Sequence, residues 1–198
     1  MVTGEIPVQW RVPESIQPGG RPPAPGSLAL VQAFINSHYD LEGTHGADLF
    51  ATPQALAGWL GEHGLIEPGA VLAPGDRARA IAVREGLRAL AGGLRVPAIL
   101  HDLNTAAGGG SAEVRFDLTG PQFVAHADGL NGALGLVLAL SAVAMIDGSW
   151  TRLKVCPGDD CGWAFYDLSR NQTGRWCSMS VCGGRAKARA HYRRRRGA

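Results

Sequence analysis

Cysteine is absent from the first 155 residues of this 198-residue chain, and all four cysteines lie in the remaining 43. Disulfides that stabilise a secreted fold would be spread along the chain rather than gathered at one end. The opening segment, MVTGEIPVQWRVPES, also lacks the basic start and the apolar run of a signal peptide. We therefore expect a cytoplasmic protein whose thiols are reduced.

An apolar run long enough to cross a membrane is missing as well. The longest such stretch, from Ala133 to Ile146, has 14 residues. A membrane-spanning helix needs about 18 to 20. We expect this stretch to form a buried helix, and we expect no membrane partner.

Acidic residues are scarce towards the C-terminal end. Residues 151–198 hold three of them beside 11 Lys and Arg, whereas residues 1–150 hold 14 beside eight. A mildly acidic part of net charge −6 is therefore followed by an end of net charge +8. This asymmetry predicts a polyanionic partner that binds the C-terminal end alone.

Local signals predict that the first part of the chain is mainly helical. Residues 1–26 are rich in proline and glycine and should form an irregular lead-in. The second helix is the best marked, because Thr52 can cap its start, Pro53 suits its first position and Gly64 can end it. Apolar spacing predicts helices over residues 27–39, 52–65, 74–93, 97–107 and 130–146.

A β-hairpin is expected between the last two of these helices. The alternation in EVRFDL, residues 113–118, predicts a strand with three apolar side chains on one face, those of Val114, Phe116 and Leu118. The segment QFVAHA, residues 122–127, can pair with it across Thr119-Gly120-Pro121. The predicted fold is mainly α, of the α+β type: a helical domain over residues 27–150 with this hairpin inserted, then a small module over residues 151–198.

The cysteines have the spacing C-x4-C, 15 residues, C-x4-C, at Cys156, Cys161, Cys177 and Cys182. Two such pairs around a short β-like insert can converge as four thiolates on one tetrahedral Zn²⁺. Four protein ligands leave no position for a catalytic water, so the expected zinc ion, one per chain, is structural. A module of about 45 residues buries too little apolar surface to fold alone, and we expect zinc to fold it without involving the front domain.

Other roles for these cysteines fit the pattern less well. Free buried cysteines would be scattered along the chain, and a disulfide would be unusual in a cytoplasmic protein. An iron–sulfur cluster also takes four cysteines, but at other common spacings. A redox dithiol would show C-x-x-C, which the chain lacks.

The C-terminal stretch LKVCPGDDCGWAFYDLSRNQTGRWCSMSVCGGRAKARAHYRRRR resembles the CGNR-type zinc finger. The cysteine spacing, CGW.F.D.SRN, WCSM and RAK.R carry the resemblance. The motif that names the family reads Cys182-Gly183-Gly184-Arg185 here, with Gly184 in place of asparagine. The front part resembles the ABATE domain through LALVQAFINS, ATPQALAGWLGEHGL and AVREGLRAL. That family is described as stress-induced transcription regulators, so the resemblance implies DNA binding under the control of the front domain.

A basic helix is predicted to begin near Ser178, which can cap it. A small-residue face that includes Ala186 and Ala190 should lie close to the zinc hairpin. Cations on both flanks suit the phosphates on both walls of a DNA groove. The residues expected to bind nucleic acid are Arg170, Arg175, Arg185, Lys187, Arg189, Arg193, Arg194, Arg195 and Arg196. RNA in place of DNA, or a solvated basic tail, are the alternatives, and one small finger favours a homodimer.

Catalytic motifs are missing from the front domain: G-x-S-x-G, a P-loop, H-E-x-x-H and G-x-G-x-x-G between a strand and a helix. We therefore expect a regulator rather than an enzyme. An enzyme with a zinc-finger appendage, acting on a nucleic acid or small metabolite, is the alternative. Polar side chains such as His38, Glu85, His101 and Asn104 suit an exposed surface. Asn36 and Arg84 are the candidates for binding a small molecule or anion between helices.

Overall fold

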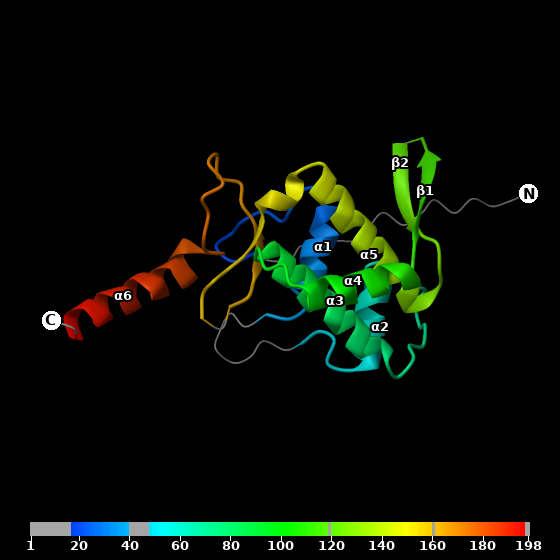
Figure 1. Ribbon diagram of the computed structural model, residues 1–198, viewed down its shortest axis with the longest axis horizontal. Helices are drawn as coiled ribbons and strands as arrows, with labels where there is room; N and C mark the ends of the chain where they lie inside the picture. The colour runs from blue at the N-terminus through cyan, green and yellow to red at the C-terminus, as the bar shows by residue number, and fades with distance from the viewer. Residues whose placement is uncertain (1–16, 40–47, 119, 160, 197–198) are drawn as a thin grey trace, which may run out of the picture.

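Figure 1 shows the computed structural model, which describes residues 17–39, 48–118, 120–159 and 161–196. The predicted mainly α fold is confirmed: helices dominate, and the strands form two short antiparallel hairpins. Five helices make the helical body: α1 Leu28–Ile35, α2 Pro53–Glu62, α3 Asp76–Ala91, α4 Pro97–Gly109 and α5 Gly129–Ile146.

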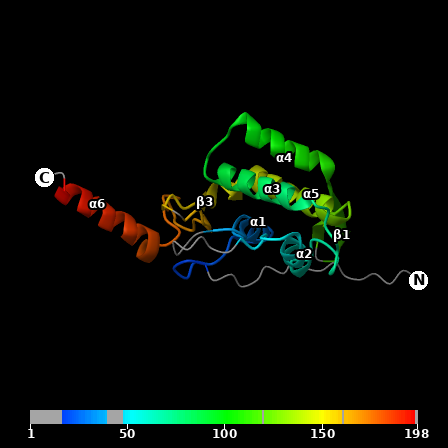
Figure 2. The same ribbon diagram turned by 90° about the horizontal axis from the view of Figure 1, so that it is seen from below.

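The helical body has three layers, which Figure 2 shows edge on. Helix α4 lies outermost, α3 and α5 form the middle layer, and α1 and α2 form the opposite layer. Helix α5 contacts α1, α3 and α4. Its inward side chains, such as Leu134 and Val137, belong to the main hydrophobic core.

Helix α2 begins and ends at the expected residues. The Thr52 side chain accepts a hydrogen bond from the Ala55 N–H at 3.1 Å, and Pro53 occupies the first helical position. Gly64 follows the helix with φ of 68°, the left-handed conformation that commonly ends a helix. Three local signals in the sequence thus fix this element.

Helix α5 matches the helix predicted over residues 130–146 to within one residue. It has 18 residues, more than the apolar run of 14 inside it, and a mean hydropathy of 2.0. By length and composition it is the one helix in the described residues that is able to cross a bilayer. In the structure it is a core helix, because it is covered on several sides by α1, α3, α4 and the strand β2. The length of an apolar segment does not distinguish these two environments.

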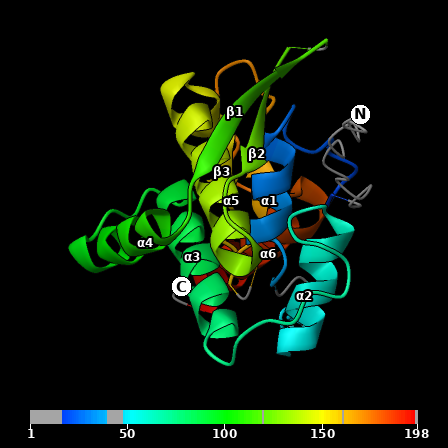
Figure 3. The same ribbon diagram turned by 90° about the vertical axis from the view of Figure 1, so that its right-hand side faces the viewer.

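The first hairpin pairs β1 Ala112–Asp117 with β2 Gly120–Ala125, and it projects from the body (Figures 1 and 3). The expected turn over residues 119–121 is wrong, because Gly120 pairs with Asp117 and Pro121 pairs with Phe116. These two pairs extend the ladder at its outer end. The apolar face is also not buried as in a core strand, since Phe116 is 81% exposed.

The second hairpin, β3 Leu153–Val155 with β4 Ala164–Tyr166, joins the helical body to the cysteine region. Strand β4 is buried on both faces. Trp163 and Phe165 pack with the four cysteines, whereas Ala164 and Tyr166 belong to the main core of the helical body. Side chains therefore alternate between the two cores along residues 163–166, and both faces of the strand are used.

The chain ends in α6 Gly184–Arg196, preceded by the π-helical turn η2 Met179–Gly183. Figure 1 shows α6 extending away from the rest of the molecule. None of its residues is buried, and Ala190 is exposed. The expected packing of the small-residue face against the zinc hairpin is therefore wrong beyond the first turn, because the helix leaves the body there.

Candidate metal centre and nucleic-acid interface

The four cysteine side chains meet at one buried point. Their sulfur atoms all lie within 4.8 Å of one another, although Cys156 and Cys182 are 26 positions apart in sequence. The Cys177 Sγ atom is 3.7 Å from that of Cys161 and 3.6 Å from that of Cys182. All four residues are free cysteines, so the sulfur atoms are available as ligands.

These separations fit a single zinc ion. A tetrahedral Zn²⁺ with Zn–S bonds of about 2.3 Å places its ligand sulfurs about 3.8 Å apart. Disulfide sulfurs lie much closer, at about 2.05 Å. The donor set, four thiolates and no water, is that of a closed structural zinc site. The four cysteines can therefore hold one zinc ion, as expected from their spacing.

Crowding of the four sulfurs shifts their acidity. Hydrogen bonds from the thiols of Cys161 and Cys177 lower the pKa of Cys156 below its ordinary value. Hydrogen bonding to the Cys156 thiolate raises the pKa of Cys161 and of Cys177, because it stabilises their protonated forms, and burial and the negative charge of the neighbour add to the rise. A divalent cation removes this repulsion, so zinc binding displaces protons from the cluster.

Tight turns bring the two cysteine pairs together. A Cβ atom on Gly158 would lie 3.2 Å from the Cys182 sulfur, so glycine lets the first turn pass close to the second pair. Ser178 caps the turn η2 by accepting a hydrogen bond from the Val181 N–H at 3.3 Å. The Gly183 N–H donates to the Ser178 carbonyl at 3.0 Å, which makes this turn π-helical and sets the position of Cys182.

A buried carboxylate organises the loop between the cysteine pairs. Asp167 has no exposed surface and accepts hydrogen bonds from Lys154 Nζ at 2.7 Å and from the Gly174 and Ser169 N–H groups at 2.8 and 3.0 Å. Burial alone would raise the pKa of Asp167, but these hydrogen bonds outweigh it and hold the pKa below its usual range. The carboxylate therefore fixes the course of residues 168–175.

Replacement of Asp167 by asparagine should lower the free energy of unfolding by about 2 kcal/mol, because charge-assisted hydrogen bonds are lost and Lys154 is left without its counterion. A lowered pKa means that the carboxylate contributes fully above pH 3.8 and loses this contribution as the pH falls further. The loss in D167N should thus be equal at pH 6 and pH 8. Urea unfolding of the zinc-loaded chain measures it. A loss that differs between these two pH values would contradict the assignment.

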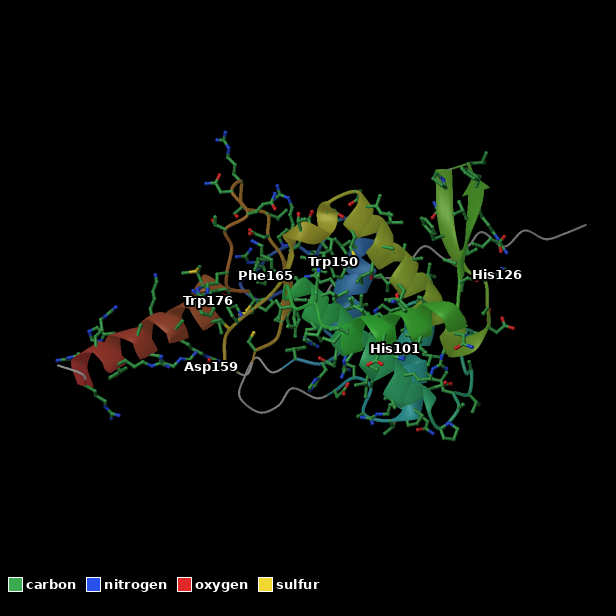
Figure 4. All side chains as sticks on the ribbon, in the orientation of Figure 1. His101, His126, Trp150, Asp159, Phe165 and Trp176 are labelled. Carbon is green, nitrogen blue, oxygen red and sulfur yellow. The ribbon has the colours of Figure 1, made fainter. Side chains whose placement is uncertain are left out.

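The cations expected to bind nucleic acid lie on two neighbouring elements. Those of α6 project from an exposed helix that starts two residues after the ligand Cys182. Arg170 and Arg175 lie on the exposed loop that Asp167 holds, and the Arg175 guanidinium stacks over the Trp176 ring at 5.2 Å. Figure 4 places Trp176 at the base of α6, so the loop and the helix are adjacent.

Among the described residues, Arg189 of α6 has an acidic partner. Arg189 Nη1 lies 3.1 Å from a carboxylate oxygen of Asp159, which follows the first cysteine. The exposed fractions of the two side chains are 41% and 65%, so this is a solvent-exposed ion pair, which contributes little stability. Figure 4 shows Asp159 beside the start of the helix.

The two residues predicted to bind a small ligand have protein partners. Arg84 is buried, and its guanidinium pairs with both carboxylate oxygens of Asp48, at 2.6 and 3.1 Å, and with Glu85 at 2.8 Å. Asn36 bonds to the backbone of Ala164. A ligand would have to displace these partners, and ligand binding by Asn36 and Arg84 stays a prediction.

Sequence reasoning missed the polar residues that join the helical body to the cysteine region. Gln17, Gln32 and Arg88 all contact residues 162–164 through hydrogen bonds, and Gln17 and Gln32 are buried. The helical spacing of residues 74–93 does not show that Arg88 contacts Gly162. The signal available was that Gln32 and Asn36 interrupt the apolar face of α1.

The fold and the metal centre define a zinc-finger protein with a helical body in front of the finger. A model of the CGNR zinc finger matches residues 152–195, and a model of the ABATE family, described as "Putative stress-induced transcription regulator", matches residues 28–149. The chain belongs to the ABATE family and ends in a CGNR zinc finger, which confirms both resemblances. No curated protein matches the chain. The domain limits at residues 26 and 150 stay a prediction.

Proposed function

We propose that this protein is a DNA-binding transcription regulator of the cytoplasm, in which α6 contacts duplex DNA and the helical body controls that contact. The observation that carries the proposal is the exposure of a dense cationic helix directly beside the metal centre. Helix α6 holds seven Lys and Arg and no carboxylate in 13 residues. It is about 20 Å long, and duplex DNA presents roughly one phosphate charge per 1.7 Å over such a length.

The metal centre gives this helix a fixed starting point. Cys182 lies in the turn η2, which continues without a break into α6. A zinc ion bound there would hold the first turn, and an isolated helix of 13 residues is only marginally stable in water. The proposal therefore makes zinc a requirement for DNA binding without any direct role in it.

Several cations around the start of α6 would act together. Arg175 stacks on Trp176, whose ring lies 3.4 Å from the position of a Cβ on Gly183. Lys187 is one turn further along the helix from Gly183. Phosphate contacts from this loop and from α6 would thus extend one continuous footprint. Arg189 would exchange Asp159 for a phosphate, a small loss for an exposed pair.

The helical body is the regulatory part of the proposal, through a small ligand or through a second copy of the chain. A groove of about 620 Å³ between α2 and residues 68–72 has the volume of a ligand site. The tip of the first hairpin exposes Phe116 and Leu118, an apolar patch of the kind found at protein interfaces. A dimer would place two fingers on a pseudo-palindromic site and raise the affinity of each.

The test is a titration of the full chain with random-sequence duplex DNA at low salt, before and after removal of zinc. We expect binding by the zinc-loaded protein and a large loss of affinity after chelation. Failure of the loaded protein to bind, or equal binding without zinc, would disprove the proposal. Single-stranded RNA of the same length is the second ligand, and tighter binding to it would replace DNA by RNA as the partner.

A further inference from the structure

The side chain of Asn36, at the end of α1, hydrogen-bonds to both backbone groups of Ala164 in β4. Its Nδ2 donates to the Ala164 carbonyl at 2.9 Å, and its Oδ1 accepts from the Ala164 N–H at 2.8 Å. The Trp163 carbonyl accepts a hydrogen bond from the Cys156 N–H on the β3 side of the strand. The N–H and C=O groups of the next residue, Ala164, therefore point away from β3. Asn36 thus takes the place of a third strand along this edge of β4.

A second polar side chain of α1 supports the same strand. Gln32 Nε2 donates to the Ala164 carbonyl at 3.0 Å and to Gln17 Oε1 at 3.0 Å. The same Gln17 oxygen accepts from Trp163 Nε1 at 3.0 Å, and the Trp163 ring packs with the four cysteines. All of these polar groups are buried, so an unpaired one would cost about 1–3 kcal/mol.

Arg88, near the end of α3, holds the residue that follows a cysteine ligand. Its Nη1 donates to the carbonyl of Gly162, directly after Cys161. Its Nη2 donates to the Ile35 and His38 carbonyls, each at 2.6 Å, at the end of α1. Glu85 accepts from Arg88 Nε at 2.9 Å and holds the guanidinium in place. One cation therefore ties α1, α3 and the first cysteine turn together.

We propose that Asn36 and Arg88 are positioning residues of the metal centre. They hold residues 162–164 so that Cys161 meets the other three sulfurs, and they link zinc binding to the stability of the helical body. Because the link is thermodynamic, it acts in both directions: a folded body favours zinc binding, and bound zinc stabilises the folded body. The finger is then part of a larger folding unit rather than an independent module. The proposal rests on the metal centre and not on DNA binding.

The first test is the zinc affinity of the full chain, measured by competition with a chromophoric chelator. We expect Asn36→Ala and Arg88→Ala to bind zinc about 10- to 100-fold more weakly, the range seen when residues that support metal ligands are removed. Arg88→Lys should not restore the affinity, because an ammonium cannot hold three carbonyls in the planar geometry of a guanidinium. Wild-type affinity in both alanine variants would overturn the proposal.

Two controls separate positioning from general destabilisation. Asn104→Ala makes the same change on the exposed face of α4 and should leave the zinc affinity unchanged. Leu56→Ala removes a fully buried side chain of α2, away from β4, and lowers the stability of the body. The zinc affinity of the Leu56→Ala variant should stay within about twofold of wild type at a temperature at which the variant is folded. An equal loss in Leu56→Ala would show that only overall stability matters and would overturn the proposal.

A second measurement needs no variant and covers the case in which Asn36→Ala does not fold. Hydrogen exchange of the wild-type chain is compared before and after chelation, and amides of α1 and α3 are followed. We expect faster exchange in both helices without zinc, by at least tenfold at the most protected amides. Unchanged exchange in α1 and α3, with faster exchange confined to residues 153–196, would overturn the proposal.

Discussion

Replacement of Cys177 by serine should abolish tight zinc binding and lower the melting temperature of the whole chain. The Cys177 sulfur is fully buried and has two other ligand sulfurs within 3.7 Å. A structural zinc site of this kind contributes about 10–16 kcal/mol to folding in isolated finger peptides. Serine provides neither the thiolate nor the correct bond length, so most of this contribution is lost in the variant.

The sequence alone predicts that this change unfolds the finger and leaves the front domain intact. The structure changes that expectation, because Leu153, Ala164 and Tyr166 belong to the main core of the helical body. We expect the body to remain folded but less stable by a few kcal/mol. For a chain of this size each kcal/mol lowers the melting temperature by about 2–4 °C. A decrease of roughly 5–15 °C in the helical signal is the expected result.

Metal analysis and thermal unfolding followed by circular dichroism measure the two effects. Met179→Ser is the matched control, because it too replaces a sulfur-containing side chain by serine. Met179 lies in the turn η2, two residues after Cys177, and its side chain is not one of the four proposed zinc ligands. The Met179→Ser variant should keep one zinc per chain. One tightly bound zinc in Cys177→Ser would refute the four-cysteine assignment. Less than one zinc per chain in the wild-type protein would refute the same assignment, as would a disulfide within either cysteine pair under reducing conditions.

Features set by neighbouring residues were predictable from the sequence. The limits of α2 follow from Thr52, Pro53 and Gly64, which act within a few residues of their own position. The convergence of the four cysteines was also predictable, since their paired spacing matches a known metal geometry. In both cases the chemistry of a short segment leaves few alternatives.

Contacts between distant segments were not predictable in the same way. Asn36 meets Ala164 across 128 positions, and the helical pattern of α1 shows which face Asn36 occupies but not what lies opposite. The alternation of β1 likewise predicts a strand, yet Phe116 is exposed because the hairpin extends past α5. Periodicity determines the face of an element, whereas the partner of that face depends on the arrangement of the whole chain.

Replacement of Arg193, Arg194, Arg195 and Arg196 by alanine should weaken DNA binding about equally for all sequences. These side chains are exposed and lie far from the cysteines along α6. About five or six phosphate contacts in the wild type would make log K fall with log[salt] at a slope near −5. Loss of the four arginines should reduce the magnitude of that slope by roughly 3–4. The zinc content should not change, which separates this effect from that of Cys177→Ser.

The control must remove the same charge from another place. Arg95 and Arg115 are exposed on the helical body, outside the finger. The double variant Arg95→Ala, Arg115→Ala therefore has the same net charge as Arg194→Ala, Arg195→Ala. Fluorescence anisotropy with a labelled duplex, at several salt concentrations, gives the slope for each. We expect the α6 double variant to lose about two units of slope and the body double variant to lose less than one.

The comparison decides between a defined interface and a general cationic charge. Net charge acts at long range and is screened within about 10 Å at 0.1 M salt, so two variants of equal charge would bind alike if only charge mattered. Phosphate contacts are local, and each removes one counterion from the DNA. Equal slopes for the two double variants would show that α6 is only a charged tail. The proposed interface requires that only the α6 double variant loses salt-dependent slope relative to wild type. This difference in slope should disappear when zinc is removed.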